Sequence, residues 1–239
     1  MLDNAKLLHV LSEEVVACRR CPRLVTYLAE VSREKRRAYR DWTYWGKPVP
    51  GFGDPEAQLL IVGLAPGAHG SNRTGRPFTG DKSGEFLYRA LYDAGFASQP
   101  TAVRRDDGLK MHNAYITASA RCAPPGNNPL PSELLHCREY LERELEILRP
   151  RAVLALGKIG WDVYLGLLKH QGIAVSRGAN PFSHGAEVEI PAAQSSPNAP
   201  RGRLFGVYHP SQQNTSTGVV TLPMYAKVLT RIRKFLEDR

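Results

Sequence analysis

The fold is decided by residues 58–81, which read QLLIVGLAPGAHGSNRTGRPFTGD. The segment opens with an apolar run that is too short for a helix and continues into glycine and proline, which is typical of a buried strand followed by a loop. A helix is expected directly after it, over residues 82–94. A strand, a glycine-rich loop and a helix in this order indicate an α/β protein.

Three further apolar runs of the same kind follow along the chain. We expect four buried strands in all, at residues 58–64, 113–119, 152–156 and 204–208. Helices are expected between and after them, from an N-cap at Ser132 to residue 148, over 158–169, and over 224–236 after Pro223. The alternation predicts an α/β fold, a three-layer α/β/α sandwich with a central four-stranded parallel sheet. In such a sheet the ligand site lies beyond the carboxyl ends of the strands.

Two regions fall outside this alternation. Residues 1–50 are expected to form helices that carry a Cys-x-x-Cys motif and the basic run 33–40, followed by the aromatic turn DWTYWGKP at 41–48. Residues 170–202 are rich in glycine, proline, serine and asparagine, and we expect an irregular insertion there. Because the chain has no internal repeat, we expect one domain.

The composition restricts the class of protein. With 239 residues, of which 42% are hydrophobic and 23% charged, the chain is neither disordered nor a coiled coil. It has no run of ~20 apolar residues and no visible export signal, so we expect a cytoplasmic, nucleoid-associated monomer without a membrane partner. The net charge of +9 indicates a polyanionic partner, nucleic acid first, with general solubility as the alternative explanation.

Four cysteines stand out in the rest of the chain. Cys18 and Cys21 form a Cys-x-x-Cys motif, whereas Cys122 and Cys137 each stand alone. The set is either two redox thiols with two buried small side chains, or one four-thiolate metal site. Structural zinc usually draws on two tight pairs, and a cubane iron–sulfur cluster fits the wide spacing at least as well. The spacing therefore leaves the metal open.

The loop after the first strand is rich in glycine but is not a nucleotide-binding loop. Gly70 and Gly75 have the P-loop separation, yet Arg76 and Pro77 follow where a P-loop needs lysine and a hydroxyl residue. Pro77 also lacks the N–H group that a phosphate would use. Phe78 in the same loop has two interpretations, a ring that stacks on a flat ligand or a ring of the hydrophobic core.

A second polar loop follows the last expected strand, where residues 208–218 read YHPSQQNTSTG. The uncharged polar run 211–217 suits contacts with phosphates better than a place in the core. His209 falls at the strand end, where a ligand site is expected.

Three motifs together resemble the uracil-DNA glycosylase superfamily, over nearly the whole chain. They are GLAPGAHGSNRTGRPFTGD at 63–81, RCAPPGNNP at 121–129 and HPSQQNTSTG at 209–218, and they are most similar to the type B, or family 5, enzymes. The related family 4 has an acidic residue at the position of Leu64 and lacks the QNTSTG run. The resemblance implies one glycosylase domain over 1–239, with a four-stranded parallel sheet between helices. It also implies a [4Fe-4S] cluster on Cys18, Cys21, Cys122 and Cys137.

The resemblance further implies an activity and the residues that perform it. Members remove uracil and some other deaminated or modified bases from DNA, which requires that the base is flipped out of the duplex. Asp81 and His209 would then be catalytic, and a second set would bind the base: Gly63, Leu64, Ala65, Gly67, His69 and Phe78. The DNA phosphates would be held by Ser211, Gln213, Asn214 and Thr217.

Two positions depart from the superfamily. The best-known branch has a water-activating aspartate where this chain has Ala65, and relatives often carry an asparagine where it has Ala118. The family 5 resemblance gives the catalytic role to Asp81, for which an N-cap of the helix that begins at Lys82 is the alternative.

Three functions are therefore compared. The first is a DNA repair glycosylase, and the second is a non-catalytic iron–sulfur DNA-binding protein on the same fold, which the alanines at 65 and 118 would suit. The third is a hydrolase of small nucleotides, which the absence of a P-loop and of a metal-binding carboxylate cluster in the sequence disfavours.

Overall fold

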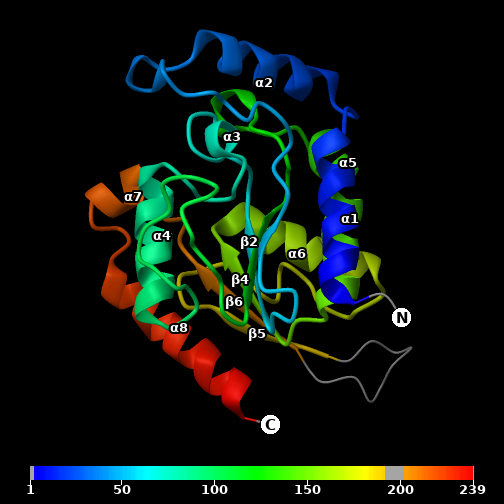
Figure 1. Cartoon of the computed structure of the whole chain (residues 1–239). Helices are drawn as coiled ribbons and strands as arrows, with labels where there is room; N and C mark the ends of the chain where they lie inside the picture. The colour runs from blue at the N-terminus through cyan, green and yellow to red at the C-terminus, as the bar shows by residue number, and fades with distance from the viewer. Residues whose placement is uncertain (1–2, 192–201, 239) are drawn as a thin grey trace.

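A six-stranded mixed sheet forms the centre of the computed structural model, which describes residues 3–191 and 202–238 (Figure 1). The strands are ordered β1-β3-β2-β4-β6-β5. Their bounds are β1 Phe52–Gly53, β2 Leu59–Gly63, β3 Ala114–Ala118, β4 Ala152–Leu156, β5 Glu187–Ile190 and β6 Gly202–Val207. All four expected strands are present, within two residues of the expected bounds.

The expectation of a sheet with only four parallel strands is wrong at both edges. The four inner strands do run parallel, with Ile61 of β2 opposite Ile116 of β3 and Leu154 of β4. However, β1 pairs with β3 and β5 pairs with β6 in the antiparallel sense. Strand β5 lies within the segment 170–202 that was expected to be irregular, and its carboxylates pair with Arg203 of β6. This edge strand depends on its partner, which local composition does not reveal.

Eight α-helices and two 3-10 turns are present in the described ranges. The helices are α1 Asn4–Ala17, α2 Pro22–Glu34, α3 Ser71–Thr74, α4 Lys82–Asp93, α5 Pro131–Leu148, α6 Lys158–His170, α7 Gln212–Ser216 and α8 Leu222–Glu237, and the turns are Arg37–Tyr39 and Pro125–Asn127. None of the helices within 3–191 and 202–238 has both the length and the apolarity needed to cross a bilayer.

Two expected helix starts are corrected. Ser132 is not the N-cap of α5, because the helix begins at Pro131, whose fixed φ suits a first turn. The Glu133 carboxylate accepts a hydrogen bond from the Leu130 amide at 2.7 Å, which satisfies that donor. Helix α8 begins at Leu222, after an N-cap at Thr221, whose hydroxyl accepts from the Met224 amide.

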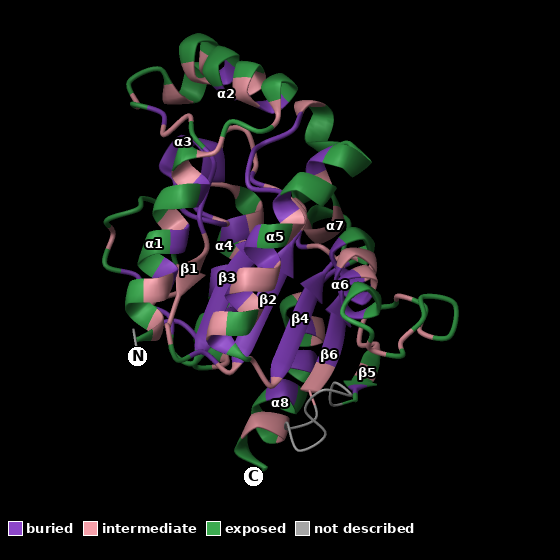
Figure 2. Cartoon of the chain, turned by 90° about the vertical axis from the view of Figure 1, so that its right-hand side faces the viewer, coloured by how far each residue is buried: buried purple, intermediate pink, exposed green. Residues whose placement is uncertain are grey.

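Helices cover both faces of the sheet, which confirms the α/β class. Alternate residues of β2 point to opposite sides. Ile61 packs in one core with residues of α4 and α8, and Val62 packs in another with residues of α5 and α6. Helix α1 lies outside, along α5 (Figure 1). Figure 2 shows the inner strands buried between these layers. The loops that leave the carboxyl ends of β2, β3 and β6 therefore meet at one edge of the sheet.

Candidate functional site

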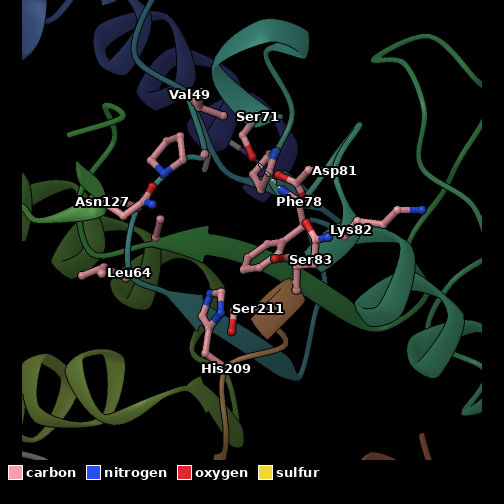
Figure 3. A pocket seen from close by; sticks show the side chains of 16 residues that line it. Val49, Leu64, Ser71, Phe78, Asp81, Lys82, Ser83, Asn127, His209 and Ser211 are labelled. Atoms are coloured by element: carbon pink, nitrogen blue, oxygen red, sulfur yellow. Dashed lines mark hydrogen bonds between the residues drawn. The ribbon is translucent and has the colours of Figure 1, made fainter. Parts of the chain in front are cut away.

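A pocket of about 420 Å³ lies where these loops meet (Figure 3). It is lined by Val49, Leu64, Ala65, Pro66, Gly67, Ser71, Pro77, Phe78, Asp81, Lys82, Ser83, Ala118, Asn127, His209, Ser211 and Gln212. Half of these residues are apolar and half are polar or charged, a combination that suits a ligand with both a flat apolar body and hydrogen-bonding groups.

His209 is placed by the end of β6 and points into the pocket (Figure 3). The side-chain amide of Asn214 donates a hydrogen bond to the His209 carbonyl at 2.9 Å and fixes the backbone there. Burial lowers the pKa of His209 below its ordinary 6.5, so the imidazole is neutral at neutral pH. A neutral ring carries one N–H donor, which suits a ligand that gains negative charge.

Phe78 packs against the core and also forms a wall of the pocket, so the core interpretation is confirmed and stacking on a ligand stays a prediction. Its ring packs against the core and lies 6.0 Å from the His209 ring, centroid to centroid. The backbone has a left-handed φ of 50°, and the Phe78 amide donates to the Ser71 hydroxyl at 3.0 Å. Gly63 does not line the pocket, but a Cβ there would lie 3.0 Å from the Phe78 ring, so glycine allows this close approach.

Asp81 is the N-cap of α4 and also lines the pocket. Its Oδ1 accepts a hydrogen bond from the Gly84 amide at 2.9 Å, which confirms the capping interpretation. Its Oδ2 faces the backbone of Gly67 and Gly70, where a Cβ at position 70 would clash with the carboxylate. Burial raises the pKa of Asp81, while the amides of Gly84 and Ser83 act in the opposite direction. Because the N-cap hydrogen bond uses Oδ1, Oδ2 remains available to contact a ligand.

The structure brings together some of the predicted site residues and not others. Seven line the pocket: Leu64, Ala65, Gly67, Phe78, Asp81, His209 and Ser211. His69 does not, because its Nδ1 is hydrogen-bonded to the Tyr44 hydroxyl at 3.0 Å. Gln213, Asn214 and Thr217 also lie outside the lining and hydrogen-bond within the loop, as in the 2.7 Å bond from the Thr217 hydroxyl to the Gln213 carbonyl. Their contacts with phosphates stay predictions.

Several lining residues were missed, and Asn127 is the most informative. It lies in the 3-10 turn after β3 and points toward the pocket from the side opposite Asp81 (Figure 3). Its backbone has a positive φ of 56°, which asparagine tolerates better than most residues. The Gly-Asn-Asn run in the second motif is typical of a turn, and it could have indicated that Asn127 lies in a loop at the site. Val49, Ser71, Lys82, Ser83 and Gln212 were also missed.

The four cysteines line a second, smaller cavity. Cys18 and Cys21 lie between α1 and α2, Cys122 follows β3, and Cys137 lies on α5. None of the four forms a disulfide, and Cys122 and Cys137 are buried. Burial and the neighbouring thiols raise the pKa of Cys21 to about 11. A thiol whose pKa is raised stays protonated at neutral pH, and a bound metal would be needed to keep it as a thiolate ligand.

An all-thiolate set can hold either a single zinc ion or an iron–sulfur cluster. In the described part of the chain no three histidine, cysteine or acidic side chains are grouped closely enough to hold one metal ion. A zinc ion with Zn–S bonds of about 2.3 Å would need all four sulfurs within about 4 Å of one another. A cubane gives each cysteine its own iron and spreads the sulfurs around the cluster. The four sulfurs line one cavity, and an all-thiolate donor set is the set that a [4Fe-4S] cluster uses, so the cluster stays a prediction.

A buried ion pair lies beside this cavity. Arg121, which lines it, donates to the Glu144 carboxylate of α5 at 2.6 and 3.0 Å, and the Thr117 hydroxyl of β3 donates to the same carboxylate at 2.7 Å. The Nε of Arg121 is buried without a hydrogen-bond partner among the described residues. The pair joins β3 to the helix that carries Cys137.

Comparisons with known proteins agree on one family. The family model described as the uracil DNA glycosylase superfamily matches residues 50–233. A protein named type-5 uracil-DNA glycosylase from Thermus thermophilus is 48% identical over 93% of this chain and 95% of its own length. One with the same name from Mycobacterium tuberculosis is 46% identical over 92% of this chain and 78% of its own. A type-4 uracil-DNA glycosylase from Archaeoglobus fulgidus is 34% identical over 54% of this chain and 58% of its own.

Proposed function

The chain belongs to the uracil-DNA glycosylase superfamily, in its type-5 branch, and we propose that the pocket beyond β2, β3 and β6 holds the flipped base during excision. The protein is a DNA repair enzyme that hydrolyses the N-glycosidic bond of uracil in DNA. The observation that carries the proposed site is the convergence on one cavity of Phe78 and Asp81, from the loop before α4, and His209, from the loop after β6.

Leaving-group stabilisation is assigned to His209. Cleavage of the bond leaves a uracil anion and a sugar with oxocarbenium character. The neutral imidazole donates its N–H to the developing anion, in a site whose walls keep water away from this charge. Phe78 stacks on the base, and the loop at 64–67 places backbone beside its edge.

Asp81 is assigned to the sugar and the water. Among the described residues it is the one carboxylate that lines the pocket, since position 65 is alanine. Its ionised Oδ2 stabilises the cationic sugar and orients a water molecule toward C1′. The oxygen of this water forms the new bond to C1′. The proton that the water releases neutralises the charge of the released base.

Asn127 is the candidate for reading the base. Its amide has both a donor and an acceptor, the combination that pairs with the edge of uracil. It would take over the task of the asparagine that relatives carry at the position of Ala118. The small side chains of Ala65 and Ala118 leave room in the cavity, which supports excision of other deaminated bases as well. Ser211 and Gln212 at the rim would contact the flanking phosphates, with Gln213, Asn214 and Thr217 next along the chain.

Cys18, Cys21, Cys122 and Cys137 would hold the [4Fe-4S] cluster. When bound, the cluster would supply a structural tie between the α1–α2 connection, the loop after β3 and α5. No step of the excision uses it.

Release of free uracil from a defined oligonucleotide under single-turnover conditions tests the proposal. The wild-type chain should release the base, and His209→Ala should lower the rate by about 100-fold or more, the usual cost of one such donor. Lys6→Gln is a control, because Lys6 is exposed on α1 and does not line the pocket. Equal rates for wild type and His209→Ala would refute the assignment.

A further inference from the structure

A cluster of exposed cations lies outside the pocket. It consists of Arg36, Arg37, Arg40 and Lys47 after α2, and Arg104 and Arg105 in the loop between α4 and β3; we refer to it as the basic ridge. None of the six has a carboxylate within 4 Å among the described residues, and the same stretches hold only two exposed acids, Asp41 and Asp106. Unpaired like charges repel one another, so such a cluster favours a polyanion.

Aromatic rings hold the two parts of the basic ridge together. The guanidinium carbon of Arg104 lies 4.9 Å from the ring centre of Trp42, and that of Arg105 lies 4.5 Å from the ring of Trp45. The Lys47 ammonium lies 5.6 Å from the same Trp45 ring. Segments nearly 60 residues apart thus present their charges side by side. Cation–π contacts of this kind limit the freedom of the side chains before any ligand binds.

A buried arginine also packs on two of the aromatic rings. The buried Arg73 guanidinium lies between Tyr39 and Trp42, 3.9 and 4.0 Å from their ring centres. It also donates to the carbonyls of His69 and Gly80, at 2.7 and 2.6 Å. Rings that already pack against cations leave less surface for stacking on unpaired bases than the rings of single-strand binding grooves do. The chemistry of the basic ridge is therefore recognition of phosphates.

The basic ridge is attached to the wall of the pocket. The Trp45 amide donates to the Arg73 carbonyl at 2.9 Å, and the Gly46 amide donates to the Asn72 carbonyl at 3.1 Å. Both acceptors are in α3, whose first residue, Ser71, lines the pocket. In Figure 1 the connection after α2 runs beside α3, at the end of the molecule away from the carboxyl end of α8.

From these contacts we infer that the basic ridge binds the phosphodiester backbone of the DNA that flanks the flipped base. The inference rests on the proposed function, because it takes the pocket as the place of the damaged nucleotide. The basic ridge extends the DNA contact beyond the rim at Ser211 and Gln212, across α3. Its contribution is independent of base sequence and depends on salt.

The test compares two triple variants of equal charge. Arg36→Gln, Arg37→Gln and Arg40→Gln remove three charges from the basic ridge while leaving the ring contacts intact. The control is Lys6→Gln, Lys227→Gln and Lys234→Gln, at exposed positions on α1 and α8. The probe is a 30-base-pair duplex with a central, non-cleavable 2′-fluoro-deoxyuridine, titrated by fluorescence anisotropy at several salt concentrations.

The triple variant of the basic ridge should bind this duplex about 10- to 100-fold more weakly than the control, with the slope of log K against log salt reduced by about 2 to 3. On a five-nucleotide strand centred on the same base, the two variants should bind alike. Equal binding of the long duplex by both variants would overturn the inference, as would an equal loss on the short strand.

Arg40→Gln alone, expected to weaken binding about 3-fold, keeps the test valid if the triple variant melts at a lower temperature. Failure of the proposed function is distinguishable, because it would abolish uracil release by the wild type while the binding comparison still gives a result.

Discussion

The pocket and the cysteine cavity are built from the same loop but in opposite ways. Ala118 at the end of β3 and Asn127 in the turn after it line the pocket, while Cys122 between them lines the cysteine cavity. The pocket is lined mainly by residues of loops, whereas the cysteine cavity is lined by the connection between α1 and α2, by α2 and α5, and by the segment after β3. The first suits a ligand that enters and leaves, and the second suits a permanent tie. Changes in the cysteine cavity should therefore affect folding, and changes in the pocket should affect rate.

The largest effect is expected for Cys122→Ala. Removing one buried ligand should abolish cluster assembly and most of the folded yield, because the four thiols join segments more than 100 residues apart. Iron and acid-labile sulfide in anaerobically purified protein should fall from about four per chain to near zero. Cys21→Ala, at a half-buried position, should lose iron with a smaller folding defect. Stoichiometric zinc in place of iron in the wild type would contradict the proposed cluster.

A somewhat smaller loss of stability is expected for Arg121→Met, which breaks the ion pair beside the cysteine cavity. The substitution leaves the Glu144 carboxylate buried without its partner, which typically costs about 3–5 kcal/mol of unfolding free energy. Adding Glu144→Leu should restore much of this loss. Chemical denaturation of both variants gives the measurement, and a loss below about 1 kcal/mol in the single variant would show that the pair contributes little.

The smallest effect is expected on the pH dependence of stability, and it concerns His209 of the pocket. Burial lowers the folded-state pKa of His209, so the unfolded chain binds a proton first as pH falls. The free energy of unfolding is therefore unaffected by His209 above about pH 6.5, and it decreases as the pH falls below this value. In His209→Gln this part of the decline should disappear in melting curves between pH 7 and 5. An unchanged pH dependence would mean that the ring is protonated without cost.

The sequence predicted the features that depend on local pattern. The four apolar runs became the inner strands because each is buried on both faces, and Asp81 caps α4 as its position before Lys82 indicated. What the sequence did not reveal depends on distant partners. Strand β5 exists through its pairing with β6, and His69 turns away from the pocket because Tyr44 binds its ring. Asn127 enters the pocket only after the loop that follows β3 is folded against the first motif.

The most direct test of the central claim is a paired measurement on Asp81. Asp81→Asn keeps the size and the acceptor of the N-cap, while Asp81→Ala removes both. If the carboxylate is catalytic, single-turnover uracil release by Asp81→Asn falls about 100-fold or more with little change in melting temperature. Asp81→Ala then loses the same rate and, in addition, about 1 kcal/mol of stability. A full rate in Asp81→Asn would contradict the account, because the residue would then be a helix cap alone.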